Sequence, residues 1–186
     1  MEYALIFQPI YDEATELQAS YLRQLEPYLK QIYPKSIFVY GNLKEEDFEY
    51  HLAKYNPRFI YFGGHGYKDG ILGAKEYIIR FGYNDYLLKG RGVYLFECDS
   101  ADTLGRFTYA RAVLGYVKPY YLYTEPTFYL GFYPLQLALQ RYTFGDIYKY
   151  TLEQYTIEIK RHPHSSDILE HNMKAFRLFG DAYFKL

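Results

Sequence analysis

The sequence of 186 residues contains one cysteine, two methionines and no tryptophan. A single cysteine excludes an internal disulfide, so the fold must be stabilised by packing. Apolar runs stay well short of the roughly 18 uninterrupted residues that a membrane-spanning helix needs. Neither sign of charge dominates, since the formal net charge is −1, and this balance gives no electrostatic reason to expect nucleic acid or a membrane as a partner. These absences favour one globular domain over residues 1–186.

The amino terminus lacks the basic start of a signal peptide. Residues 1–6 enter an apolar, strand-like run at once, so we expect a cytoplasmic protein. The chain is rich in aromatic residues, with 26 Tyr and 14 Phe. Tyrosine combines a large packing surface with a polar tip. The aromatic residues at 120–123 and 129–133 therefore fit either ordinary core packing or a substrate cleft.

Apolar runs and helical periodicities alternate along the chain. Strands are expected at 3–8, 36–40, 58–62, 93–97, 113–117 and 120–123, with a last one within 179–184. Helices are expected at 12–32 (bent or split by Pro27), 45–55, 103–111, 130–141 and 144–161, and from Ser166 or Asp167 onward. Residues 66–92 look least regular, with a short helix at 84–89. The alternation predicts an α/β fold, a three-layer α/β/α sandwich with a mostly parallel sheet.

Two of these strands deliver a reactive side chain where strand gives way to loop. Cys98 follows the run at 93–97, and His65 follows the run at 58–62 after two glycines. In open parallel sheets, ligands bind at the carboxyl ends of the strands. A thiol and an imidazole at two such ends can form a nucleophile and its proton partner. The alternative for a lone intracellular cysteine is a small buried hydrophobe.

These segments resemble the caspase-fold (clan CD) cysteine peptidases, which include caspases, metacaspases, gingipains, separase and CHAT domains. In that group one buried strand ends in His-Gly and a second, after a variable loop, ends in the catalytic Cys. Here residues 59–66 read Phe-Ile-Tyr-Phe-Gly-Gly-His-Gly and residues 93–98 read Val-Tyr-Leu-Phe-Glu-Cys. A strand with glycine at 112–116 also fits. The Leu-Phe-Gly-Asp at 178–181 is similar to the close of gingipain-like and CHAT domains.

The resemblance implies a cysteine endopeptidase that acts on a polypeptide through a thioester acyl-enzyme. Cys98 would be the nucleophile and His65 the base, and the backbone N–H groups of Gly66 and Cys98 would hold the oxyanion. No metal or organic cofactor is implied. A unit this small is expected to be restrained by a regulatory protein partner or a homodimer.

The sequence departs from the family pattern in the substrate pocket. Caspases have Gln, and metacaspases an acidic residue, two positions before the cysteine, where the side chain lies on the same side as the thiol. Phe96 occupies that position and cannot bind a charge. Asp12 could supply an acidic pocket residue, as in some metacaspase-like relatives, although capping of the following helix is the interpretation we favour. Ala101 stands where many relatives have glycine.

Three alternatives remain open. The first is a catalytically inactive caspase-like fold that acts as a protein-binding or regulatory module, favoured by Phe96 and Ala101. The second is a flavodoxin-like binder of nucleotide or phosphate at the glycine-rich residues 63–66, which lack a phosphate-binding signature. The third is a metal site formed by His162, His164 and His171, for which solvent exposure is the favoured interpretation.

Overall fold

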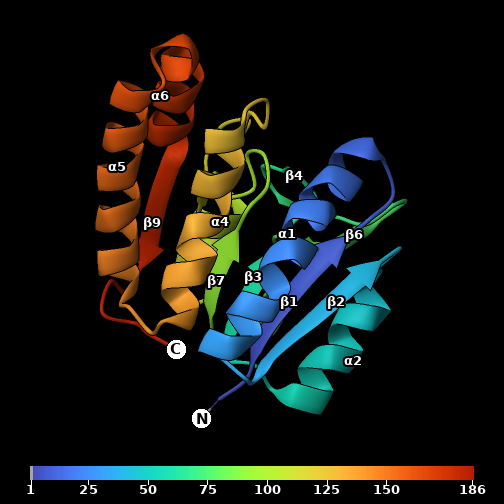
Figure 1. The fold of residues 1–186 in the computed structure, drawn as a ribbon. Helices are drawn as coiled ribbons and strands as arrows, with labels where there is room; N and C mark the ends of the chain where they lie inside the picture. Colours follow the sequence, from blue (N-terminus) through green and yellow to red (C-terminus); the bar gives the residue numbers. More distant parts are fainter. Residues whose placement is uncertain (1) are drawn as a thin grey trace.

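The computed structural model describes residues 2–186 and shows an α/β fold built on a mostly parallel sheet of six strands (Figure 1). The strand order is β2-β1-β3-β7-β8-β9. The strands are β1 (Ala4–Pro9), β2 (Ser36–Gly41), β3 (Phe59–Phe62), β7 (Gly92–Leu95), β8 (Ala112–Tyr116) and β9 (Phe176–Gly180). All neighbours pair in parallel except β8 and β9, which are antiparallel. The predicted fold class is confirmed.

Helices cover both faces of the sheet because its central strands are apolar on both sides. On one face, α1 (Glu13–Ile32), α4 (Glu125–Leu139) and α5 (Phe144–Arg161) pack against alternate strand residues such as Tyr61 and Tyr94. On the other face, α2 (Glu45–Tyr55) packs with α3 (Leu104–Phe107) and the 3-10 helix η1 (Asp85–Leu88). The last helix, α6 (Ser166–Ala175), follows the short η2 (Pro163–Ser165) and stands beside α5 (Figure 1).

Residues 66–92 are more regular than the sequence indicates. They form most of a small antiparallel sheet of β4 (His65–Tyr67), β5 (Gly70–Leu72) and β6 (Tyr77–Arg80). These strands are only three or four residues long, which is too short for a periodic pattern to reveal. A Cβ on Gly70 would lie 2.4 Å from the Ile79 carbonyl oxygen, so glycine is what lets β5 and β6 pair closely. The predicted helix at 84–89 is present as η1.

Several other expectations are corrected. Helix α1 runs unbroken through Pro27, because Leu22 and Leu29 on either side of the proline pack into the same core. Residues 120–123 form no strand, since the backbone of Tyr121 pairs with a side chain of α6 instead of a neighbouring strand. The helix expected at 103–111 is the single turn of α3, and the last strand ends at Gly180. Within residues 2–186, every helix is too short or too polar to span a bilayer.

Candidate active site

His65 and Cys98 lie at matching positions beyond two paired strands. Phe62 of β3 is the register partner of Leu95 of β7, and each reactive residue follows three positions later. Both side chains line one open cleft of about 620 Å³ at the carboxyl edge of the sheet. The other lining residues come from the start of α1, from Gly64 and from the segment after β8: Asp12, Glu13, Ala14, Leu17, Gln18, Gly64 and Tyr120 to Tyr123.

Asp12 both caps α1 and contacts His65. Its Oδ1 accepts the Thr15 N–H at 2.9 Å, while its Oδ2 lies 2.8 Å from His65 Nε2. Burial alone would raise the pKa of Asp12, but the hydrogen bonds from Thr15 and the proximity of His65 outweigh it and hold the pKa below its usual value. An ionised Asp12 only accepts hydrogen bonds, so Nε2 carries the proton and a neutral His65 is left with Nδ1 as a proton acceptor. The favoured helix cap is therefore present, and Asp12 contacts the imidazole as well.

The Cys98 thiol is half-buried against the segment 120–123. The Tyr120 N–H donates to Sγ at 3.4 Å. Burial raises the pKa of the Cys98 thiol, and the nearby Asp99 and Glu97 raise it further, while the Tyr120 N–H lowers it. Because raising effects dominate, the thiol keeps its proton at neutral pH in the ligand-free protein. A base must then remove the proton during any nucleophilic attack.

Gly66 brings the backbone of β4 against the residue that follows β7. A Cβ at Gly66 would lie 2.9 Å from the Cys98 carbonyl oxygen and 2.6 Å from Glu97 Oε2, so a side chain does not fit there. Within the described chain, the Cys98 N–H has no hydrogen-bond acceptor. The fold thus makes no use of this donor. The role of Gly66 and Cys98 as an oxyanion hole remains a prediction.

Helix α6 holds the wall of the cleft, a contribution that the sequence did not reveal. Asn172 Oδ1 accepts the Tyr121 N–H at 3.1 Å, and Asn172 Nδ2 donates to the Tyr121 carbonyl at 3.1 Å. Asn172 is fully buried, and one residue before it His171 Nε2 lies 2.9 Å from the Pro119 carbonyl oxygen. These contacts fix the segment that lies on the Cys98 sulfur. Asn172 is separated from Cys98 by more than seventy positions, and no motif marks it.

Phe96 does not line the cleft, which corrects its expected place in a substrate pocket. It lies on the same face of the sheet as the thiol, as period two predicts, but its side chain is fully buried. Its ring packs 5.0 Å from the rings of Tyr120 and Phe132. Phe96 is therefore a core residue that packs against the Tyr120 ring. In this conformation a substrate cannot reach it.

Glu97 is buried beneath the loop that carries His65. Both of its carboxyl oxygens lack a hydrogen-bond partner within residues 2–186, and burial raises its pKa well above the usual value. The side chain lies away from the cleft, as the alternation of a strand predicts. Burial favours its neutral form, and any negative charge on it raises the pKa of the Cys98 thiol.

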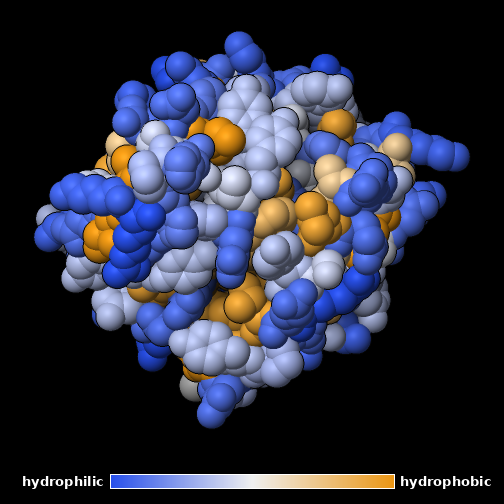
Figure 2. Space-filling model, turned by 45° about the horizontal axis from the view of Figure 1, so that its top comes forward, coloured by the Kyte–Doolittle hydropathy of each residue, from blue (hydrophilic) through white to orange (hydrophobic). Residues whose placement is uncertain are grey.

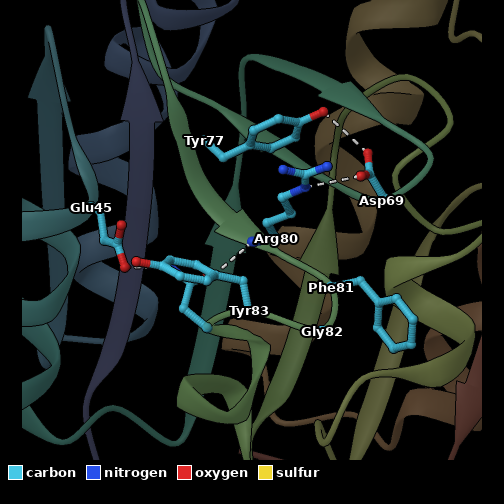
Figure 3. Close-up of a pocket in the computed structure, with 8 residues that line it drawn as sticks. Glu45, Asp69, Tyr77, Arg80, Phe81, Gly82 and Tyr83 are labelled. Carbon is cyan, nitrogen blue, oxygen red and sulfur yellow. Dashed lines mark hydrogen bonds and ion pairs between the residues drawn. The ribbon is translucent and has the colours of Figure 1, made fainter.

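Other parts of the molecule offer weaker candidates. A second pocket of about 480 Å³ lies at the small sheet, where Asp69 accepts hydrogen bonds from Tyr77 and Arg80 (Figure 3). It contains neither of the two reactive residues. His162 contacts the Glu158 carboxylate, and His171 contacts the Pro119 carbonyl oxygen. Among residues 2–186 no three His, Cys, Asp or Glu side chains gather as a metal site would require.

The face that carries the carboxyl ends of the parallel strands mixes polar and apolar surface. Figure 2, turned so that the top of Figure 1 comes forward, shows hydrophobic residues in several separate orange patches between hydrophilic ones. None of them extends over the whole face. The geometry thus defines an α/β protein with a half-buried thiol and a carboxylate-bound histidine in one cleft.

Comparison with solved structures agrees with this class of fold. The chain is similar to the complex of pro- and mature domains of Porphyromonas gingivalis RgpB, with 14% identity and a TM-score of 0.62. It is also similar to the Arg-specific cysteine proteinase gingipain R (RgpB), with 15% identity and a TM-score of 0.61. In each case 99% of this chain is covered but only 48% or 47% of the solved chain, so this chain spans about half its neighbour's length. The likeness shows a gingipain-type, caspase-like fold.

Sequence comparisons add nothing to this likeness. No protein-family model matches the chain, and no curated protein matches it.

Proposed function

We propose that this protein is a cysteine endopeptidase with Cys98 as nucleophile and His65 as base. The observation that carries the proposal is the shared cleft: the thiol and the imidazole open into one hollow, and the imidazole is bound through Nε2 to Asp12. The fold of the solved cysteine proteinase supports the same chemistry. A sheet with helices on both faces suits many functions, so the site must carry the argument.

The proposed reaction starts from a protonated thiol. His65 Nδ1 takes the proton as Sγ attacks a peptide carbonyl carbon, and the N–H groups of Gly66 and Cys98 donate to the oxygen that becomes negative. His65 then gives its proton to the leaving amine, which yields a thioester. Water, activated by His65, hydrolyses the thioester and releases the acid. Asp12 orients the ring and stabilises the imidazolium, as a carboxylate does in a catalytic triad.

Cleavage of a peptide library by the wild-type protein and by Cys98→Ala tests this proposal. The wild type should cleave and Cys98→Ala should not. His65→Ala should lose about 10²–10⁴-fold in rate, the range for a general acid–base residue, and Asp12→Asn should lose at least about tenfold because the tautomer is no longer fixed. Thr143→Ala, which removes the cap of α5 far from the cleft, is the control and should keep the wild-type rate. Equal empty profiles for wild type and Cys98→Ala would refute peptidase activity.

A second candidate is an inactive fold of the same class that binds a protein or regulates one. The burial that raises the pKa of Cys98 favours it, as does Ala101, which is fully buried where relatives often have glycine. The solved neighbour is a complex of pro- and mature domains, which makes a polypeptide partner reasonable for this chain too. A partner or homodimer, and a cytoplasmic location, remain proposals. Specific binding of a polypeptide without any cleavage would favour this second function.

A further inference from the structure

The polar groups of the cleft are mostly committed to partners within the protein. Gln18 Oε1 accepts the Gly64 N–H at 2.8 Å and the Gln8 amide at 3.3 Å. Both carboxylate oxygens of Asp12 are engaged, one by Thr15 and one by His65. Beyond the reactive pair and Glu13, a ligand that enters the cleft therefore meets mainly the hydroxyl groups of Tyr121 and Tyr123 as free polar groups.

The surface that remains free in the cleft is apolar and aromatic. Leu17, on the α1 side, keeps 44% of its surface exposed, and Tyr123 on the opposite wall keeps 73%. The rings of Tyr121 and Tyr123 stack with centroids 5.7 Å apart. Leu122 completes this wall. Because the Asn172 side chain makes two hydrogen bonds to the Tyr121 backbone, the aromatic wall is already held in place in the ligand-free protein.

Two carboxylates line the cleft, and that of Asp12 is engaged by Thr15 and His65. Glu13 is the one lining carboxylate without an ion pair or hydrogen bond to another described side chain, and it is exposed on the first turn of α1. An exposed carboxylate binds a cation weakly, because water screens the attraction. A charged ligand side chain that entered the cleft would lose hydration without gaining a buried partner.

We infer that the cleft selects polypeptides with a large apolar or aromatic side chain next to the carbonyl that Cys98 attacks. The side chain would pack between Leu17 and the wall formed by Tyr121, Leu122 and Tyr123, where aromatic rings can stack or meet edge to face. This inference deepens the proposed function and rests on it for the reaction. The binding preference itself follows from the free surface of the cleft.

The first test measures binding, which does not require catalysis. Acetylated pentapeptide amides that differ only at the central residue (Leu, Tyr, Arg or Asp) are titrated into the Cys98→Ala variant and followed by NMR. The Leu and Tyr peptides should bind about tenfold more tightly than the Arg and Asp peptides, within the range by which a hydrophobic pocket discriminates. Leu17→Ser and Tyr123→Ser should each remove most of this preference. Tyr83→Ser, which replaces an equally exposed tyrosine at the second pocket, should keep it.

The second test offers the same peptides to the wild-type protein. Cleavage after Leu or Tyr in preference to Arg supports both the inference and the peptidase. Cleavage that favours Arg, or shows no preference, overturns the inference and leaves the peptidase standing. Selective binding of the apolar peptides without cleavage keeps the inferred selectivity and refutes the peptidase. Failure of every peptide to bind or to be cleaved overturns the inference.

Discussion

At the scale of single residues, Glu97 is a buried carboxyl group without a hydrogen-bond partner among residues 2–186. A carboxyl group without hydrogen bonds in a protein interior is stable only when neutral. Ionisation of Glu97 would also place a negative charge near the thiol and the tyrosines at 11 and 61, and its charge raises the pKa of each of them. We expect its protonation to be coupled to the stability of the whole fold.

The first prediction concerns this coupling. In the unfolded chain Glu97 loses its proton near pH 4.5, whereas the raised pKa keeps it protonated in the folded protein. The unfolded state therefore binds fewer protons above pH 4.5, and this group lowers the free energy of unfolding by about 1.4 kcal/mol per pH unit until the folded pKa is reached. Glu97→Gln should remove that decline in urea titrations between pH 5 and 8. Glu49→Gln, at an exposed site, should retain it, and an unchanged slope in Glu97→Gln would refute the argument.

At the scale of elements, α6 acts on the cleft through one amide side chain. A buried Asn is stable when its donors and acceptor are paired, and here a single residue of the loop satisfies both ends of Asn172. The helix thereby replaces a neighbouring strand as the hydrogen-bond partner of Tyr121. This explains why residues 120–123 stay out of the sheet although their composition favours a strand.

Asn172→Leu tests this role, because leucine has a similar volume but cannot pair with the peptide. The free energy of unfolding should fall by about 2 kcal/mol or more, since the N–H and C=O of Tyr121 lose their partners. Hydrogen exchange at the Tyr121 amide should accelerate. Asn42→Leu, at an exposed position, should change the stability by less than about 0.5 kcal/mol. Unaltered exchange at Tyr121 would show that α6 does not hold the segment.

At the scale of the whole molecule, the end of the chain closes the core at the amino ends of the strands, opposite the cleft (Figure 1). The Phe184 ring packs 5.3 Å from that of Phe144 on α5 and lies under the Arg58 guanidinium at 4.8 Å. Gly92 at the start of β7 leaves room for it, since a Cβ there would come within 2.3 Å of the Phe184 ring. The Phe184 side chain thus contacts α5, the start of β7 and Arg58, the residue before β3.

Truncation of that side chain should therefore destabilise the protein as a core substitution does. Phe184→Ala should lower the free energy of unfolding by about 3–5 kcal/mol, through lost burial and the cavity left behind. The neighbouring Tyr183 is 88% exposed, so Tyr183→Ala should cost less than about 0.5 kcal/mol. Thermal unfolding of the two variants side by side measures the difference. Equal melting temperatures would contradict the closing role of Phe184.

The amino-acid sequence by itself determined the layers of the fold and the ends of its strands. Long apolar runs and amphipathic periods are local properties, so α2 and α5 could be placed within their exact bounds and the parallel sheet followed from the alternation. The same reasoning put His65 and Cys98 at neighbouring strand ends, because parallel strands share one carboxyl edge.

Only the tertiary structure decided which groups meet. Asp12 and His65 are 53 positions apart in the sequence, and Asn172 is 51 positions from Tyr121, to which it is hydrogen-bonded. Neither contact follows from a local pattern. The burial of Phe96 beneath Tyr120 and the apolar walls of the cleft likewise depend on how α1, α4 and α6 pack on the sheet. The environment of a side chain depends on neighbours that are distant in the sequence, so no local pattern along the chain reveals it.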